Sequence, residues 1–284
     1  MLFPLSRAPG CLSSAIRIAL ACLCLALPVS IARSADAPAV PPGGDAGWIV
    51  TLGLMPAMVT FPGSHESGSA YPLPWFSVRR PGEAAEFFSP DDGLDFTLFS
   101  SGGFSAGPVA DLRSGRRPGG GLSALGFRNV PATVDAGVYA EYWTVPDFLR
   151  SRLELRQAVN GAGLGARLDI GLDFVRRVGK TTISGGPRAA MGDRSYMLSY
   201  FGTSTNPPPP AVPYRPGAGP RSLGGILAVN HALDDTLSIL AFARLDRLVG
   251  GAEHSPATGV SRARWELLTG VGVAWSFAWK PSAP

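Results

Sequence analysis

Cysteine is almost absent from this sequence. It occurs three times in 284 residues, at Cys11, Cys22 and Cys24. All three lie in residues 1–32, which resemble a secretory signal peptide: two arginines, an apolar run that ends at Pro28, and small residues at Ser30 and Ala32. A lipoprotein site at Cys22 is an alternative, but alanine stands three positions before it, where leucine is preferred. Without the leader the chain has no thiol, which excludes disulfides, thiolate metal sites and cysteine nucleophiles.

Long apolar runs and charged side chains are also scarce. After the leader, no apolar stretch reaches the ~20 residues that a membrane-spanning helix needs. Charged residues make up 16% of the chain, and the net charge of +4 falls to +2 without the two leader arginines, because 23 basic and 21 acidic residues then remain. This balance argues against a nucleic-acid partner, which needs a concentrated basic surface. Glycine (36) and proline (27) are abundant, which favours strands and turns over helices.

Alternation of apolar and polar side chains is the main positive signal. Residues 264–279 carry large apolar side chains at nearly every second position, with mostly small or polar residues between them. Residues 133–142, 149–156 and 167–174 repeat the pattern, with charges on one face. Successive side chains of a strand point to opposite faces, so each stretch has one apolar and one polar face. Behind an export signal, this pattern is typical of a transmembrane β-barrel.

The sequence therefore predicts an all-β fold. We expect a single antiparallel transmembrane β-barrel of about 12 strands over residues 47–279, with both termini in the periplasm. A flexible Pro/Ala/Gly-rich segment, residues 33–46, would precede the barrel, and a short tail, residues 280–284, would follow it.

Three details of the strand assignment carry consequences. Residues 84–100 are interpreted as one long strand with a bulge, and residues 194–201 as a short aromatic strand. Pro72 and Pro74 suit a strand start or an edge strand. With 12 crossings, six connections are predicted outside the cell: 60–70, 101–103, 144–147, 175–179, 203–220 and 249–262. The long connection 114–131 is then predicted on the periplasmic side.

The polar faces of two adjacent stretches would line the barrel interior. Their charged side chains are Arg150, Arg152, Glu154, Arg156, Arg167, Asp169 and Asp173. These charges either pair across strands and fill the interior, or form the constriction of a narrow channel for small solutes. Aromatic residues near strand ends are expected to be interfacial anchors, and the last of them an assembly signal: Trp48, Trp143, Trp275, Phe277 and Trp279.

Motifs for catalysis or cofactor binding are weak. Residues 161–166 fit a loose dinucleotide fingerprint, but a strand pattern follows where the fingerprint needs a helix. Residues 178–181 resemble the end of a phosphate-binding loop without its first glycine. The three histidines, His65, His231 and His254, do not combine with Asp or Glu at the spacing of a metal site. We therefore expect neither an enzyme nor a cofactor.

Short motifs follow one another along nearly the whole mature chain. They are Pro62-Gly63-Ser64, Gly107-Pro108, Arg116…Leu125-Gly126, Asp135-Ala136-Gly137 with Tyr142, Tyr196…Tyr200-Phe201-Gly202, Arg244-Leu245, Ser255-Pro256 and Gly270…Trp275…Phe277. In this order and spacing they resemble the MltA-interacting protein (MipA)/OmpV family of outer-membrane barrels. The resemblance implies a protein of the Gram-negative outer membrane, surrounded by its lipid. It also implies a scaffold that brings a murein transglycosylase to a murein synthase, although other members are discussed as adhesins.

We therefore expect a non-enzymatic scaffold for murein hydrolase and murein synthase at the cell wall. Its partner contacts are expected in and beside the connection 114–131, at Arg113, Arg116, Arg117 and Arg128. Alternatively, these arginines face anionic headgroups. A narrow channel through the charged interior and a surface adhesin are the alternative functions.

Overall fold

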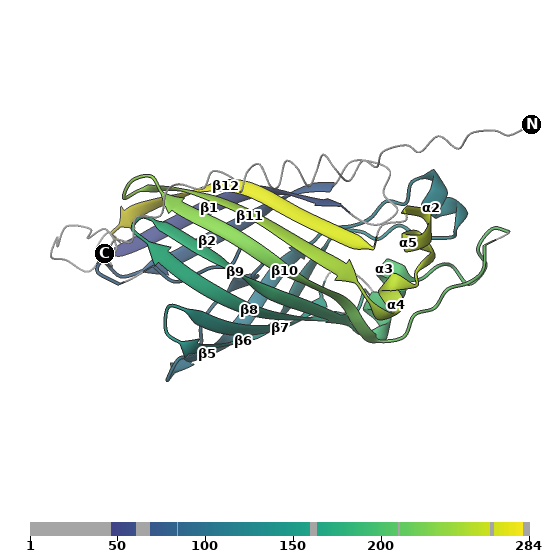
Figure 1. Ribbon diagram of the computed structural model, residues 1–284, viewed down its shortest axis with the longest axis horizontal. Coiled ribbons are helices and arrows are strands. Elements are labelled where there is room, and N and C mark those ends of the chain that lie inside the picture. Colours follow the sequence, from purple (N-terminus) through teal and green to yellow (C-terminus); the bar gives the residue numbers. More distant parts are fainter. Residues whose placement is uncertain are drawn as a thin grey trace, which may run out of the picture. The chain divides into compact units, whose positions relative to one another are not determined.

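The computed structural model describes residues 47–60, 69–83, 85–159, 164–209, 211–261 and 264–280. The predicted signal peptide, the segment 33–46 and the tail after Lys280 lie outside these residues. The described chain forms an antiparallel β-barrel, which confirms the predicted fold class (Figure 1). No helix in these ranges is long and apolar enough to cross a membrane.

A single 12-stranded sheet makes the barrel wall. Its strands are β1 (Trp48–Thr60), β2 (Ser69–Arg79), β3 (Leu94–Asp95), β4 (Phe99–Ser101), β5 (Phe104–Arg113), β6 (Thr133–Val145), β7 (Leu149–Ala158), β8 (Ala166–Val178), β9 (Thr181–Gly192), β10 (Gly219–Ala232), β11 (Leu237–Leu248) and β12 (Trp265–Trp279). Both β3 and β4 pair with β5, and the N–H groups of Phe96 and Leu98 between them also bond to β5 carbonyls. Residues 94–101 thus occupy one position in the wall.

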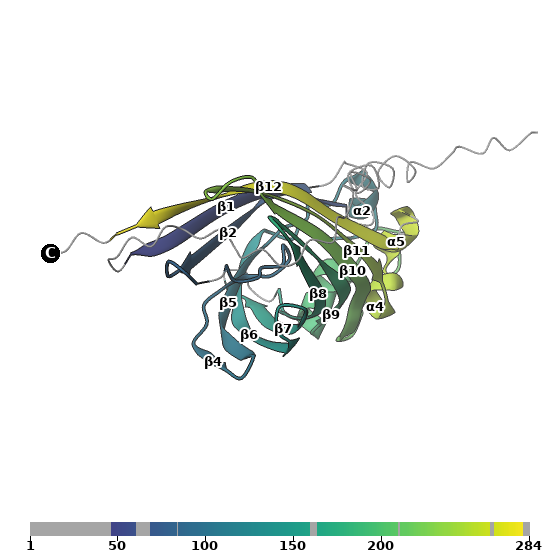
Figure 2. The same ribbon diagram turned by 60° about the vertical axis from the view of Figure 1, so that its left-hand side comes forward.

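The barrel is nearly closed, with one seam. The sheet runs in the order β2-β1-β12-β11-β10-β9-β8-β7-β6-β5, followed by β3 and β4. Among the described strands, β2 pairs only with β1, so β2 and the β3–β4 position face each other without pairing (Figure 2). Pro72 and Pro74 lie in β2 and lack the N–H group that a second neighbouring strand would need. The position of β2 at the end of the sheet confirms the edge-strand prediction.

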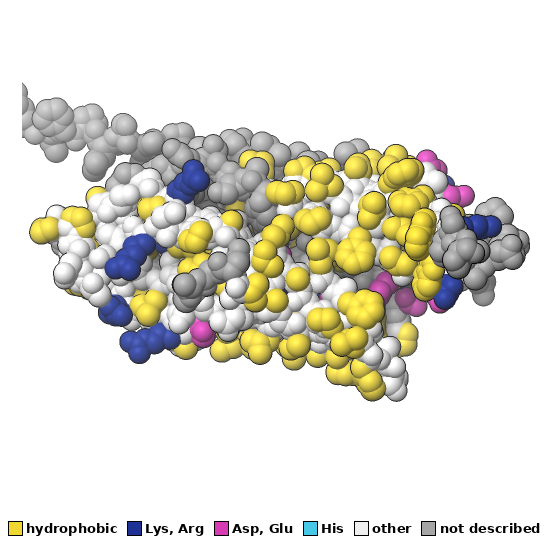
Figure 3. Space-filling model, turned by 180° about the vertical axis from the view of Figure 1, so that it is seen from behind, with side chains coloured by type: hydrophobic (Ala, Val, Ile, Leu, Met, Phe, Trp, Pro, Cys, Tyr) yellow, Lys and Arg dark blue, Asp and Glu magenta, His cyan; other side chains and the backbone are white. Residues whose placement is uncertain are grey.

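The apolar faces of the strands point outward. In β12, Val271, Val273 and Trp275 are 58%, 54% and 56% exposed, whereas Gly270, Gly272 and Ala274 are buried. Figure 3 shows hydrophobic side chains across the middle of the barrel and most charged side chains at its two ends. Burial of charge and exposure of leucine, valine and tryptophan is the arrangement of a barrel whose outer face contacts lipid.

The segment predicted as an aromatic strand is a helix. α3 (Arg194–Phe201) begins after Asp193, whose carboxylate accepts a hydrogen bond from the Tyr196 N–H. Tyr196 and Tyr200 are four residues apart, which places them on one helical face, and their rings stack at 4.8 Å. The strand prediction was wrong because a short segment with several aromatic residues suits either structure, and here the N-cap decides.

The segment 84–100 is only in part a strand. Residues 94–101 join the wall, but residues 85–93 enter the barrel, and we call residues 85–93 the luminal segment. Its Ser89 and Pro90 are fully buried, and its Asp91 and Asp92 contact arginines of the wall. Those ion pairs across the interior replace the ladder bonds that an unbroken strand would make.

These two differences change which connections share an end of the barrel. Trp48 pairs with Trp279, so β1 begins and β12 ends at the same end of the barrel, which we call the terminal end. The short turns of the barrel also lie there: 102–103, 146–148, 179–180 and 233–236. The opposite end, the loop end, carries α2 (Gly120–Ala124), α3, α4 (Gly250–Glu253) and α5 (Pro256–Ser261) (Figure 1).

The predicted alternation of sides was therefore wrong in part. The connection 114–131 lies beside the proline-rich connection 203–220, where the Ser204 N–H bonds to the Gly126 carbonyl at 2.8 Å. The turns at 101–103, 144–147 and 175–179 lie at the terminal end, not with 203–220 and 249–262. The luminal segment and α3 were each counted as part of a crossing, and each error reversed the sides of all later connections.

Candidate functional site

β7 supplies the centre of a charged interior. Arg150, Arg152, Glu154 and Arg156 alternate with outward Leu153 and Leu155, and all four charged residues are at most 5% exposed. The strand keeps this orientation because a one-residue shift would place four charges in lipid. Removal of charge from water on this scale requires partners for each group, and neighbouring strands and the luminal segment supply them.

Asp91 joins the luminal segment to two strands of the wall that lie on either side of β10. Its carboxylate accepts from Arg188 Nε of β9 at 2.8 Å and from Arg244 Nη1 of β11 at 2.9 Å. The Ser89 hydroxyl donates to the same carboxylate at 2.7 Å. One buried carboxylate therefore links two strands of the wall, β9 and β11, to the chain inside the barrel.

Asp92 attaches the same segment to β7. It accepts two bonds from the Arg150 guanidinium, at 2.8 and 3.2 Å, a paired geometry that fixes the orientation of both groups. Arg150 also donates to Asp173 of β8 at 2.7 Å and to Glu141 of β6 at 3.1 Å. It is the largest fully buried side chain of the described residues.

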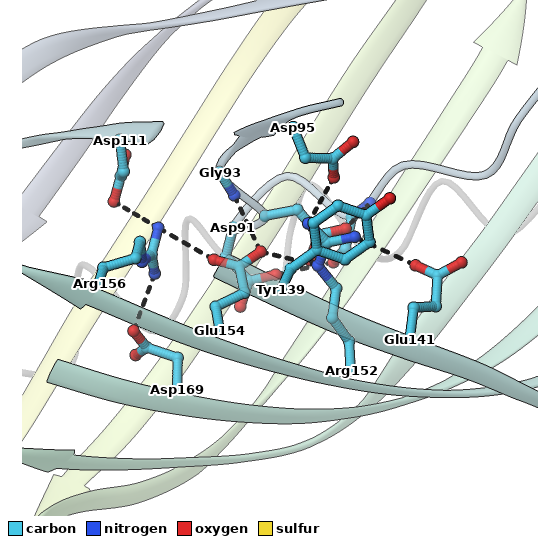
Figure 4. A network of polar contacts seen from close by, with 12 residues as sticks. Asp91, Gly93, Asp95, Asp111, Tyr139, Glu141, Arg152, Glu154, Arg156 and Asp169 are labelled. Atoms are coloured by element: carbon cyan, nitrogen blue, oxygen red, sulfur yellow. Dashed lines mark hydrogen bonds and ion pairs between the residues drawn. The ribbon is translucent and has the colours of Figure 1, made fainter. Parts of the chain in front are cut away.

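Arg152 forms the middle of the network drawn in Figure 4. It donates to Glu154 at 2.7 Å, to Asp95 at 2.5 Å and to Glu141 at 3.1 Å, and it lies over the Tyr139 ring at 4.2 Å. Four groups from three strands thus surround one guanidinium.

Gly93 allows the luminal segment to approach the wall closely. Its N–H donates to Glu154 Oε1 at 3.2 Å. A Cβ atom at this position would lie 2.5 Å from a Val109 methyl and 2.9 Å from the Ala110 carbonyl oxygen, closer than van der Waals contact permits. Glycine is therefore required by the close packing of the segment against β5.

A second cluster lies on the other side of Glu154 (Figure 4). Arg156 donates to Asp111 at 2.7 Å and to Asp169 at 2.8 Å, and Arg167 contacts the same two carboxylates at 3.2 and 2.6 Å. All seven interior charges predicted from the sequence thus lie in one connected set of ion pairs. The interpretation of paired charges across strands matches this geometry.

The interior charges that sequence reasoning missed include Asp91, Asp92, Arg188 and Arg244. The prediction places the two aspartates in the bulge of a strand, and the alternation around Arg188 is weak. A useful signal was available: an Asp-Asp pair beside Pro90 and Gly93 is poorly suited to a strand, and the number of arginines at inward positions called for more acidic partners.

Two cavities adjoin the luminal segment. A cavity of about 230 Å³ lies at the seam, lined mostly by apolar side chains of β2, β5 and the luminal segment. A polar cavity of about 120 Å³ lies between the luminal segment and α3, lined by groups such as Asp91, Arg167 and Tyr200. Within the described ranges, no three His, Cys, Asp or Glu side chains converge as metal ligands.

Two of the predicted partner-contacting arginines hold the loop end together. Arg113 donates to Asp135 at 2.7 Å and is 5% exposed. Arg116 donates to the carbonyls of Tyr200 and, at 3.3 Å, Ser199, in the last turn of α3. A cation at a helix C-terminus is favourable, although burial lowers the pKa of Arg116 to about 10. Burial likewise raises the pKa of Tyr200 to about 12.

The other two predicted contact residues, Arg117 and Arg128, are exposed at the loop end. These two side chains are accessible to a ligand or partner, whereas those of Arg113 and Arg116 are not exposed. All four arginines lie at the loop end, opposite the terminal end where β1 begins and β12 ends. The prediction that they share an end with the two termini was wrong.

The predicted anchors lie at the terminal end. Trp275 and Trp279 are exposed on the outer face, with Phe277 packed against Trp275 at 5.0 Å, and Arg80 covers the Trp48 ring at 3.6 Å. Trp143 differs from the prediction. It continues the inward row of β6, and its indole N–H donates to Glu141 at 2.9 Å.

A family model covers most of the chain. The family described as "MltA-interacting protein MipA" matches residues 50–277. No curated protein matches the chain.

Three solved structures are similar at low identity. The COG4313 outer membrane channel from Pseudomonas putida F1 is 12% identical, with a TM-score of 0.35 over 86% of this chain and 100% of that one. Neisserial surface protein A is 10% identical, with a TM-score of 0.24 over 81% and 97%. The Ralstonia pickettii toluene transporter TbuX is 8% identical, with a TM-score of 0.29 over 84% and 90%. Likenesses this distant carry no argument about function.

Proposed function

Because the chain belongs to the MltA-interacting protein MipA family, we propose that this outer-membrane β-barrel is a non-enzymatic scaffold for murein enzymes. The family name supports a murein transglycosylase as one partner. A murein synthase is the second partner in the proposal, since a scaffold must bring two proteins together.

The ion-paired interior is the observation that carries this proposal. Asp91 and Asp92 attach the luminal segment to β7, β9 and β11, and the seven interior charges of β7 and β8 all make ion pairs. A barrel whose interior is occupied by ion pairs suits a rigid anchor better than a passage for solutes. The channel alternative would require the luminal segment to leave, which breaks several buried ion pairs.

The proposed orientation places the terminal end in the periplasm. Outer-membrane barrels have short periplasmic turns and longer external loops, and the short turns of this barrel lie at the terminal end. Murein lies in the periplasm, so we expect the partner contacts at these turns and not at the connection 114–131. The exposed charged residues in and beside these turns include Asp147, Arg176, Arg177, Lys180 and Asp235.

Retention of the two enzymes on the immobilised barrel tests the proposal. The terminal-end variant replaces Arg176, Arg177 and Lys180 with glutamine. The loop-end variant, its matched control, replaces Arg117, Arg128 and Arg215, three exposed arginines of the opposite end. We expect the wild-type barrel and the loop-end variant to retain the transglycosylase, and the terminal-end variant to lose most of it. No retention by the wild-type barrel would refute the scaffold, and loss only in the loop-end variant would refute the orientation.

A further inference from the structure

The two ends of the barrel differ in exposed charge. Every described Asp or Glu with an exposed side chain lies at the terminal end: Glu83, Glu86, Asp147, Asp234 and Asp235. Five exposed basic residues balance them there: Arg80, Arg176, Arg177, Lys180 and Lys280. At the loop end the described exposed charges are all arginines: Arg117, Arg128, Arg194, Arg215, Arg247 and Arg264. One end is therefore close to neutral, and the other is basic.

Most of the loop-end arginines keep their charge unpaired. Arg247 and Arg264 share one partly buried carboxylate, Glu253, at 3.5 and 2.8 Å. The other four make no ion pair with any residue in the described ranges. Two arginines on one carboxylate still leave a net positive charge, so the part of this end that the structure describes carries a net positive exposed charge.

The position of Arg247 relates this charge to the membrane. It follows Leu245 by two residues on β11, and both side chains are exposed on the same outward face. Its partner in register on β12 is Trp265, which is 48% exposed. An arginine that continues an apolar outward row, opposite a tryptophan, lies where hydrocarbon gives way to headgroups.

The residue type narrows the ligand. All six exposed basic residues described at this end are arginines, as are 23 of the 25 basic residues of the chain. The guanidinium presents planar paired donors that match the oxygens of a phosphate group, and it is less strongly hydrated than an ammonium group. A set of exposed arginines at one end of a barrel suits phosphate groups held in the surrounding leaflet, because neighbouring lipids can contact different arginines.

We infer that the loop end binds the phosphate groups of lipid A in the outer leaflet. This assignment rests on the orientation proposed above, which places the loop end outside the cell, but it does not depend on the scaffold function. The exposed arginines then form a surface that contacts anionic lipid, and the terminal end is left for other contacts.

Binding of purified lipid A to the full-length barrel in detergent tests the inference. The ligands are bisphosphorylated lipid A, lipid A with both phosphates removed, and inorganic phosphate as a competitor. The wild-type barrel should bind the bisphosphorylated form, and removal of the phosphates should weaken binding roughly tenfold or more, because each basic residue near an anionic surface adds about a fivefold factor. Inorganic phosphate at millimolar concentration should not compete, since it lacks the acyl chains that hold lipid A at the barrel.

The same two triple variants serve as test and control. The loop-end variant should bind bisphosphorylated lipid A roughly tenfold more weakly or worse, and the terminal-end variant should bind like the wild type. Equal urea midpoints of unfolding for all three proteins establish that folding is unchanged. Binding that does not depend on the phosphates, or that falls equally in both variants, would overturn the inference. Effective competition by inorganic phosphate would instead indicate a free-phosphate site and would also overturn it.

Discussion

The substitution Asp91→Asn gives the sharpest test of the luminal segment. It keeps the size of the side chain and removes the charge that two arginines share. The carboxylate accepts three bonds from Arg188 and Arg244, at 2.8, 3.2 and 2.9 Å. Hydrogen bonds to charged groups contribute about 1.5–3 kcal/mol each. Complete loss would therefore be severe, but both arginines keep another acidic partner, Asp173 at 2.6 Å and Asp246 at 2.8 Å respectively.

These remaining partners set the expected magnitude. Removal of one member of a buried ion pair costs about 3–5 kcal/mol when its partner is left alone, so we expect a loss near the lower limit, about 3 kcal/mol. Urea unfolding of the barrel refolded in detergent, followed by tryptophan fluorescence, measures this free energy. Asp235→Asn, which removes the same charge from an exposed turn, should change it by less than about 0.5 kcal/mol. A free energy of unfolding for Asp91→Asn equal to that of the control would show that the carboxylate does not hold the segment.

Four further predictions concern the interior and the loop end. In planar bilayers the wild-type barrel should give no steady single-channel conductance steps, whereas replacement of residues 85–93 by a short Gly/Ser linker should produce them. Conductance steps of the wild-type barrel that change in Arg152→Ala would favour the channel instead. Gly93→Ala should lower the free energy of unfolding by about 1–3 kcal/mol through the forced contact with Val109, and an unchanged value would show that the backbone shifts freely. Arg116→Met should leave the barrel folded but make the loop-end connections more sensitive to protease, because two carbonyls of α3 lose their donor; wild-type resistance would contradict this. The pKa of Tyr200 is raised to about 12, so its phenol should stay protonated above pH 10, and ultraviolet titration of wild type minus Tyr200→Phe should show a late transition; a difference transition near pH 10 would refute it.

The wall of this barrel was predictable because its signal is local. Each strand must alternate, and the alternation in 149–156 or 264–279 requires no knowledge of other segments. The face that points to lipid also followed from the sequence, since an export signal and an apolar row of residues such as Val271, Val273 and Trp275 are read from the chain alone. The inward positions of Arg150 and Asp173 follow from the same rule.

The interior arrangement was not predictable in the same way. Asp91 reaches Arg244 across the barrel, and the separation of these residues in sequence is 153 positions. No local pattern specifies such a contact. The helix α3 was missed for another reason: its eight residues are too few for periodicity to separate helix from strand, and the Asp193 cap that decides the question lies outside the aromatic pattern. Each error added one crossing, so the predicted number of crossings stayed even and gave no warning.

The seam between β2 and the β3–β4 position has a consequence for connectivity. Read from β3 through β12 and then to β1 and β2, the order of strands around the wall is the order of a chain. With β3 and β4 taken as one position, the only described strand pair that departs from this order is β1 with β12. Across it the hydroxyls of Thr51 and Ser276, 225 positions apart in sequence, form a hydrogen bond. A circular permutant that joins Trp279 to Trp48 and is cut before the luminal segment would break no strand pair and would make every pair in the wall sequential. Its contact order would fall while its native contacts stayed the same, so any change in its folding rate would measure the cost of closing the natural barrel over its full length.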